Sequence, residues 1–217
     1  MSSYGTASPV LRRSSRRRPS RAAARRRRRI ARTFAALALA AVVVLAVRLG
    51  PHAVRELTLP LRHEDIIRQQ AAEKSLDPAL IAAVIYQESK FRDRTSSAGA
   101  KGLMQLLPGT AEFIARKSGG TRFELKDLGT AQVNISYGSW YLRYLLTRYS
   151  GNEVLAIAAY NAGADNVDSW VRSAGGPARF DAIRDIPFPE TRDYVQGVLS
   201  KRAAYAKTYP KELGLRR

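Results

Sequence analysis

A single glutamate at the end of an apolar segment is the clearest candidate for acid–base chemistry in this sequence. Helical spacing places Glu88 on the same face as three apolar residues, Ile81, Val84 and Ile85, so the carboxylate ends an apolar stripe along one face of the helix. A carboxyl group held there loses solvation of its charged form, so we expect a raised pKa and a proton retained near neutral pH. These are the properties of a general acid. A glutamate that only marks where an apolar face meets solvent is the structural alternative.

The element that positions this carboxylate begins with a clear helix-start signal. Asp77 is a good N-cap residue, and Pro78 suits the first helical position. No run of alternating strand residues and no hairpin signal interrupts the helical pattern that begins at Leu61. We therefore expect an all-α body with a loop over 91–107. Besides the Glu88 helix, the expected helices are 61–75, 108 or 110 to 119, 131–149, 153–161, 164–174 and 190–209.

The positive charge is concentrated at the N-terminus. The 217 residues carry a net charge of +19, and residues 1–32 contain 12 arginines and no acidic residue. The remainder holds 25 basic and 18 acidic residues, a net charge of +7. Residues 1–32 have too few large apolar side chains to fold alone, so we expect a disordered cytoplasmic segment. The moderately basic body favours an anionic polymer, either nucleic acid or bacterial wall.

An uncharged apolar stretch follows, and it predicts a transmembrane helix. Residues 33–47 contain no charge, and flanking arginines can extend the span over 33–50 toward the roughly 20 residues that a bilayer requires. The preceding arginines predict a single-pass signal anchor in the cell membrane. Its N-terminus would be cytoplasmic, and the catalytic body would lie outside, in the periplasm or on the cell-wall side. We expect a linker over 51–60, the folded domain over 61–209 and a polar tail over 210–217.

Two other interpretations of the apolar stretch remain. A cleaved signal peptide has a similar layout, but the small-x-small triplet Ala38-Leu-Ala40 lies in the middle of the apolar core rather than after it. A buried helix of a soluble protein is disfavoured by the arginine run beside it.

The composition also excludes several kinds of site. The absence of cysteine rules out disulfides, thiol catalysis and thiolate metal sites. His52 and His63 both precede the main part of the body and have no partner at ligand spacing. We therefore expect neither a metal nor a cofactor.

Five short motifs occur in order along the body. They are Glu88-Ser-x-Phe91, Gly102-Leu-Met-Gln105, Asn134-x-x-x-Gly138, Ala159-Tyr-Asn-Ala-Gly163 and Glu190-Thr-x-x-Tyr194. Together they resemble the lytic transglycosylases of the soluble-transglycosylase (SLT) type, which have a lysozyme-like multi-helix domain. The resemblance implies cleavage of the β-1,4 bond between N-acetylmuramic acid and N-acetylglucosamine in peptidoglycan, with a 1,6-anhydromuramoyl end as product. It also implies that Glu88 is the single catalytic acid/base.

The resemblance assigns the surrounding residues to substrate binding. They are Ser96, Ser97, Met104, Gln105, Tyr160, Asn161, Glu190 and Tyr194. In the family, a loop serine hydrogen-bonds the catalytic carboxyl. The number of residues before Gly102 matches Ser96 to that serine, whereas the number of residues after Glu88 matches Ser97. Both therefore remain candidates. Structural alternatives exist for the others, such as core packing for Met104 and a favourable helix-dipole contact for Glu190.

A single carboxylate needs help from the substrate. Most glycosidases use two carboxyl groups, whereas the only acid near Glu88 in the sequence is Asp93, between two arginines. The acetamido oxygen of the sugar can replace the second carboxylate.

Three other functions remain open at this point. A hydrolytic muramidase of the same fold would give reducing ends, and a wall-binding protein would give no product. A nucleic-acid binder would use the arginine segment, but that segment lacks interleaved aromatic residues and adjoins an apolar span. Membrane topology and contact with anionic lipids explain it more simply, so we expect peptidoglycan and the membrane as partners and no nucleic acid.

Overall fold

The computed structural model describes residues 58–119 and 122–215, and these residues form an all-helical body. The predicted disordered segment (1–32) and anchor (33–50) lie outside the described residues. The elements are α2 (Glu64–Lys74), α3 (Pro78–Ser89), α4 (Pro108–Ser118), the 3₁₀ helix η1 (Leu125–Gly129), α5 (Ala131–Arg148), α6 (Glu153–Ala162), α7 (Ala164–Ser173), α8 (Ala182–Asp185) and α9 (Pro189–Thr208). Within the described part, β pairing is limited to isolated bridges around Lys101. The all-α prediction is confirmed there.

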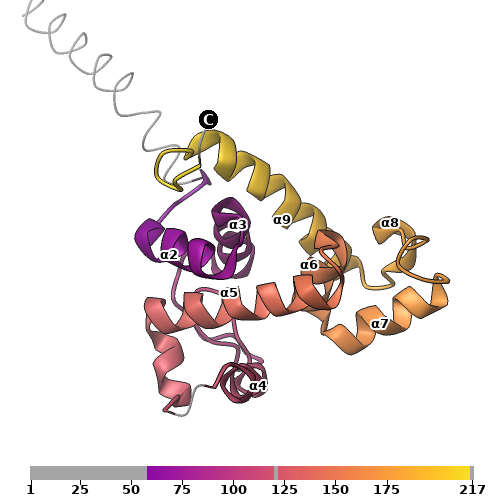
Figure 1. The fold of residues 1–217 in the computed structure, drawn as a ribbon, viewed down its shortest axis with the longest axis horizontal. Helices are drawn as coiled ribbons and strands as arrows, with labels where there is room; N and C mark the ends of the chain where they lie inside the picture. Colours follow the sequence, from indigo (N-terminus) through magenta and orange to yellow (C-terminus); the bar gives the residue numbers. More distant parts are fainter. Residues whose placement is uncertain (1–57, 120–121, 216–217) are drawn as a thin grey trace, which may run out of the picture. The chain divides into compact units, whose positions relative to one another are not determined.

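The helices surround two long elements, α5 and α9. Helices α2, α4 and α6 pack against α5, while α9 packs along α3 and α6 (Figure 1). The main hydrophobic core surrounds α3. A smaller cluster of Leu106, Ala111, Ile114 and Leu128 lies beside α4 and η1. Neither η1 nor α8 was expected, because each is too short to show helical periodicity.

Helix α3 is buried on every side along most of its length. The predicted helix start is confirmed, since the Asp77 carboxylate accepts a hydrogen bond from the Ala79 N–H at 2.8 Å. The expected apolar stripe is wrong, because every residue from Ala79 to Ile85 is buried. The carboxylate of Glu88 thus lies near the end of a helix that is buried from Ala79 to Ile85, where α3 approaches the surface.

Both ends of the described body extend beyond the expected domain limits. We expected a linker up to residue 60, but Leu59 is buried and its carbonyl accepts the Tyr209 hydroxyl at 2.8 Å. The neighbouring Pro60 carbonyl accepts the Tyr205 hydroxyl at 2.6 Å. We expected a polar tail after 209, but Leu213 is only 1% exposed. The packed domain therefore includes the residues on both sides of 61–209.

No helix among residues 58–119 and 122–215 is both long and apolar enough to cross a membrane. The segment predicted to do so is outside those ranges.

Candidate active site

The Glu88 carboxyl lies in a surface cleft of about 420 Å³. The cleft is formed by the end of α3, the loop before α4, the first turn of α4, and α5 and α6. Its lining residues are Glu88, Ser96, Ala98, Ala100, Gln105, Leu106, Leu107, Thr110, Tyr141, Tyr160, Asn161, Ala162 and Gly163. Of these, Tyr141 and Tyr160 pack against both hydrophobic clusters, so the cleft lies where the two clusters meet. Glu88 is the only carboxylate among the lining residues.

The protonation of Glu88 is set by two opposing effects. Burial raises the pKa of Glu88 from its ordinary value of 4.5 to about 7. The Tyr194 hydroxyl, which donates a hydrogen bond to Oε1 at 2.6 Å, and the charge of Arg94 both pull that pKa down. Burial is the larger effect, so the carboxyl holds a proton close to neutral pH. The raised pKa expected from the sequence is found, although its cause is the end of a buried helix rather than an apolar stripe.

Two tyrosine hydroxyls near Glu88 stay protonated and donate hydrogen bonds. Burial, followed by the charge of Glu88, raises the pKa of both Tyr160 and Tyr194 well above its ordinary value. The Tyr160 hydroxyl donates to the Met104 carbonyl at 3.0 Å, which links α6 to the loop before α4. Tyr194 comes from α9, whose close packing against α3 brings its hydroxyl to the carboxylate.

The loop that forms one wall of the cleft is held by its own polar groups. Gln105 adopts a positive φ of 47°, and its side-chain amide donates to the carbonyls of Gly102 at 2.7 Å and Arg94 at 2.9 Å. The Arg94 guanidinium in turn donates to the backbone carbonyl of Glu88 at 2.5 Å. These contacts fix the loop to the end of α3.

Asn134 joins this loop to α5. It is 1% exposed. Its Oδ1 accepts the Met104 N–H at 2.8 Å, while its Nδ2 donates to the carbonyls of Lys101 and Leu128, each at 3.0 Å. A glycine is required at Gly102, because a Cβ there would lie 2.1 Å from Asn134 Nδ2. The motifs containing Asn134 and Gly102 therefore hold each other in place.

The two candidate serines differ in position. Ser96 lines the cleft, and its hydroxyl accepts the Ala100 N–H at 3.0 Å within a tight turn. Ser97 is exposed and is not among the lining residues. The structure therefore brings Ser96, and not Ser97, to the cleft that contains Glu88.

The remaining expected residues fall into two groups. Gln105, Tyr160 and Asn161 line the cleft with Glu88. The Met104 side chain, by contrast, is fully buried, and Glu190 is exposed at the first turn of α9 without lining the cleft.

Sequence reasoning did not single out Thr191 or Tyr141. Thr191 is 1% exposed and its hydroxyl donates to Asn161 Oδ1 at 2.8 Å, which ties the start of α9 to the cleft. Thr191 could have been predicted from the sequence, because it lies inside the Glu-Thr-x-x-Tyr motif. No motif contains Tyr141, whose position in the cleft depends on how α5 packs.

Within residues 58–119 and 122–215, no group of three or more histidine, aspartate or glutamate side chains is arranged to hold a metal ion. The cleft combines one protonated carboxyl group with neutral hydrogen-bonding side chains. Such a site is suited to proton transfer on a neutral, hydroxyl-rich ligand.

Comparison with known proteins finds similar sequences and structures. The chain is 34% identical over 160 residues to the soluble lytic murein transglycosylase of Salmonella typhimurium, covering 69% of this chain and 24% of that protein. Its structure resembles lytic transglycosylase Slt from Pseudomonas aeruginosa, with a TM-score of 0.66 and 37% identity over 75% of this chain and 26% of that one.

The 70 kDa soluble lytic transglycosylase from Escherichia coli is similar in structure, with a TM-score of 0.67 and 32% identity over 75% of this chain and 27% of that one. The chain thus spans about a quarter of the length of these relatives. The family model described as the transglycosylase SLT domain matches residues 65–183, more than half of the chain. The chain therefore belongs to the transglycosylase SLT domain family.

Proposed function

We propose that this protein is a lytic transglycosylase that cleaves the β-1,4 bond between N-acetylmuramic acid and N-acetylglucosamine in peptidoglycan. The observation that best supports this function is the lone carboxyl group of Glu88, which is protonated near neutral pH and opens into a cleft. Membership of the SLT family and the names of the similar proteins support the same substrate.

In the proposed reaction, Glu88 acts first as an acid and then as a base. It protonates the glycosidic oxygen as the acetamido oxygen of the muramoyl residue attacks the anomeric carbon, and the N-acetylglucosamine end leaves. The resulting carboxylate accepts the proton of the muramoyl 6-hydroxyl, whose oxygen displaces the acetamido oxygen and closes the 1,6-anhydro ring. A pKa of about 7 suits both steps, because neither protonation state is strongly disfavoured at neutral pH.

The substrate-binding residues follow from which side chains reach the cleft. We assign sugar contacts to Ser96, Gln105 and Asn161, polar residues that line the cleft. Tyr194 is assigned a positioning role, since its hydroxyl is bound to Glu88 and stabilises the carboxylate form needed in the second step.

We also propose that residues 33–50 anchor the protein in the cell membrane, with the N-terminus in the cytoplasm and the enzyme domain on the side where peptidoglycan lies. This proposal rests on the apolar segment and the twelve arginines before it. The arginine segment would contact anionic lipids. Protease treatment of intact and of permeabilised cells tests the topology, because the N-terminal segment should be cut only after permeabilisation.

The decisive experiment for the activity is mass spectrometry of the fragments that the full-length protein releases from purified sacculi. We expect 1,6-anhydromuramoyl ends, which are lighter than reducing ends by one water molecule. Release of reducing ends would identify a hydrolytic muramidase instead. Sacculi that are bound but not cut would identify a wall-binding protein.

A further inference from the structure

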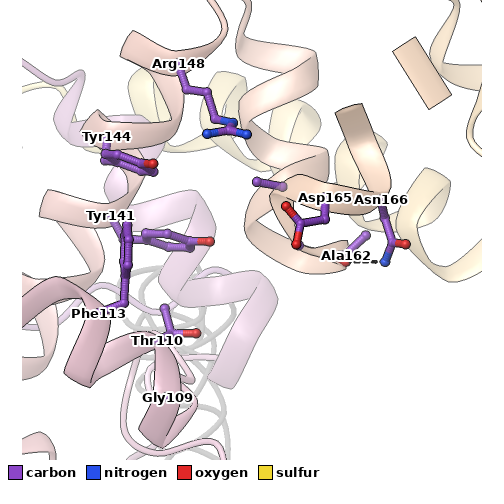
Figure 2. Close-up of a pocket in the computed structure, with 11 residues that line it drawn as sticks. Gly109, Thr110, Phe113, Tyr141, Tyr144, Arg148, Ala162, Asp165 and Asn166 are labelled. Carbon is purple, nitrogen blue, oxygen red and sulfur yellow. Dashed lines mark hydrogen bonds between the residues drawn. The ribbon is translucent and has the colours of Figure 1, made fainter. Parts of the chain in front are cut away.

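Two arginines near the Glu88 cleft differ in whether a carboxylate balances their charge. Arg148 points toward a second pocket, of about 440 Å³, which shares Tyr141 with the cleft (Figure 2). Its guanidinium forms an ion pair with Asp168 at 2.5 Å, so its charge is compensated within the fold. Arg94, by contrast, forms no ion pair in the part of the chain that the structure describes. An unbalanced positive charge therefore remains beside the end of α3.

Hydrogen bonds hold both the side chain and the backbone of Arg94 in place. Its Nη2 donates at 2.5 Å to the backbone carbonyl of Glu88, one of the carbonyls in the last turn of α3 that have no partner within the helix. The carbonyl of Arg94 accepts the Gly102 N–H and the Gln105 side-chain amide, each at 2.9 Å. The guanidinium therefore cannot turn away from α3 without breaking a hydrogen bond, and its charge is fixed before a ligand binds.

The groups around the Glu88 carboxyl differ in charge. Burial raises the pKa of Glu88, whereas Tyr194 through its hydrogen bond and Arg94 through its charge lower it. Tyr194 from α9 and Tyr160 from α6 both remain uncharged, because burial raises the pKa of each hydroxyl well above its ordinary value. Neither tyrosine can balance a negative charge on Glu88. The positive charge that acts on this carboxyl is that of Arg94.

The acid-then-base sequence needs a charge of this kind. When Glu88 protonates the glycosidic oxygen, a carboxylate forms inside the cleft, where burial disfavours it. A fixed positive charge nearby stabilises that ion but has little effect on the neutral carboxyl group. It thereby makes the protonated group a stronger acid, which favours the first proton transfer, and it keeps the carboxylate in place until the second.

We propose that Arg94 is a positioning residue for the reaction, whose fixed positive charge stabilises the carboxylate that Glu88 becomes after it gives up its proton. This inference rests on the proposed function, since it takes Glu88 to act as an acid and then as a base. Arg94 and Tyr194 have separate parts in it. The tyrosine supplies a hydrogen bond to Oε1 of Glu88, and the arginine supplies the opposite charge.

The same loop offers a matched control. Three other charged side chains follow α3, namely Lys90, Arg92 and Asp93; all three are exposed, and none is among the groups that shift the pKa of Glu88. Arg92 carries the same charge as Arg94 two positions away, and within the described residues its side chain makes no hydrogen bond or ion pair. Its replacement therefore measures the loss of a positive charge from the loop in general.

The test is an NMR titration of the Glu88 carboxyl in the full-length protein, solubilised in detergent and labelled with ¹³C at the glutamate side-chain carboxyl groups. The signal that is absent from Glu88→Gln identifies the residue. We expect Arg94→Gln to raise the midpoint of its titration by about half a pH unit, since a nearby positive charge is lost. Arg94→Lys keeps the charge and should raise the midpoint less, and Arg92→Gln should leave it unchanged. The backbone contacts of residue 94 are available in every variant.

The outcomes separate the role of the charge from that of the loop structure. Equal midpoints for Arg94→Gln and Arg92→Gln would overturn the proposal, and so would an equal rise for Arg94→Gln and Arg94→Lys. The alkaline limit of kcat/KM should move with the NMR midpoint, and a limit that stays in place would also count against it. If the midpoint depends on the charge at position 94 but the parent protein yields no anhydro ends from sacculi, the action of Arg94 on the Glu88 carboxylate stands and the proposed reaction fails.

Discussion

The Tyr194 hydroxyl lies 2.6 Å from Oε1 of Glu88 and donates a hydrogen bond to it. This bond joins α9 to the end of α3 across 106 positions of sequence. Burial holds the carboxyl in its protonated form, while the tyrosine stabilises the ionised form. The two effects together bring the pKa of Glu88 to about 7, so that the group can give up a proton and take one back.

Replacing Tyr194 by phenylalanine should raise the pKa of Glu88 further. The lost hydrogen bond stabilised only the carboxylate, so the pH at which activity declines on the alkaline side should rise by about one pH unit. The measurement is the pH dependence of kcat/KM on soluble glycan fragments. Tyr149→Phe is a matched control, because it removes a tyrosine hydroxyl that donates to Asp168 at 3.0 Å, outside the cleft. An alkaline limb that stays in place, or that moves to lower pH, would contradict the assigned role of Tyr194.

Replacing Glu88 by glutamine should reduce activity by a factor of about 10²–10⁴ and make the protein more stable at alkaline pH. The folded-state pKa of Glu88, about 7, lies above the ordinary value of 4.5, so the folded protein binds more protons than the unfolded chain between these values. The stability of the parent protein should therefore fall as pH rises through that window. A glutamine avoids this loss, which amounts to at most about 3 kcal/mol.

The stability comparison can be made by urea unfolding at pH 4 and pH 8. The two proteins should differ little at pH 4, and Glu88→Gln should be the more stable at pH 8. Glu112→Gln provides the control for an exposed carboxylate. A stability difference that is the same at both pH values would show that burial does not raise the pKa of Glu88.

Local signals were sufficient to predict how α3 begins and that Glu88 lies near its end. Asp77 and Pro78 mark the start, and the cap they predict is present. The stripe was a misinterpretation that the sequence could have corrected. No polar residue occurs between Pro78 and Tyr86, and a helix that is apolar on every side is a buried helix.

The tertiary contacts of the site could not be predicted in the same way. The pairing of Tyr194 with Glu88 and the three hydrogen bonds of Asn134 depend on how helices distant in sequence pack together. A motif can show that a residue matters without showing what it touches. Met104 illustrates this, because its motif suggested a ligand contact while its side chain is fully buried.

Asn134→Ala should destabilise the protein by about 3 kcal/mol. The substitution leaves the buried Met104 N–H without its acceptor and deprives the carbonyls of Lys101 and Leu128 of a donor. Because the same loop carries Gln105, kcat/KM should fall even at temperatures where the protein stays folded. Thermal unfolding and activity assays test both effects. A variant with unchanged melting temperature would show that the loop does not depend on Asn134.

Gly138→Ala should be destabilising, although alanine is normally the better helix former by roughly 1 kcal/mol. A Cβ at this position would lie 2.3 Å from Met104 Sδ and 2.9 Å from Met104 Cβ, so the buried side chain has to move. Gly197→Ala is the matched control in α9, where the added Cβ meets only the flexible end of Gln87 at 2.8 Å. We expect the melting temperature to fall for Gly138→Ala and to change little for Gly197→Ala. The opposite order would mean that Met104 is free to repack.

A chain that begins at residue 61 should be less stable than one that begins at residue 58. The carbonyls of Thr58, Leu59 and Pro60 accept hydroxyls from α3, from the residue that caps α9 and from α9 itself, the first of them from Tyr86 at 3.1 Å. Removing these residues deletes those hydrogen bonds and exposes the surface covered by the Leu59 side chain, a combined loss of about 4 kcal/mol. Urea unfolding of the two truncated proteins measures the difference. Equal midpoints would place the domain boundary at 61, as first expected, whereas the predicted difference would make residues 58–60 part of the structure that holds α3 against α9.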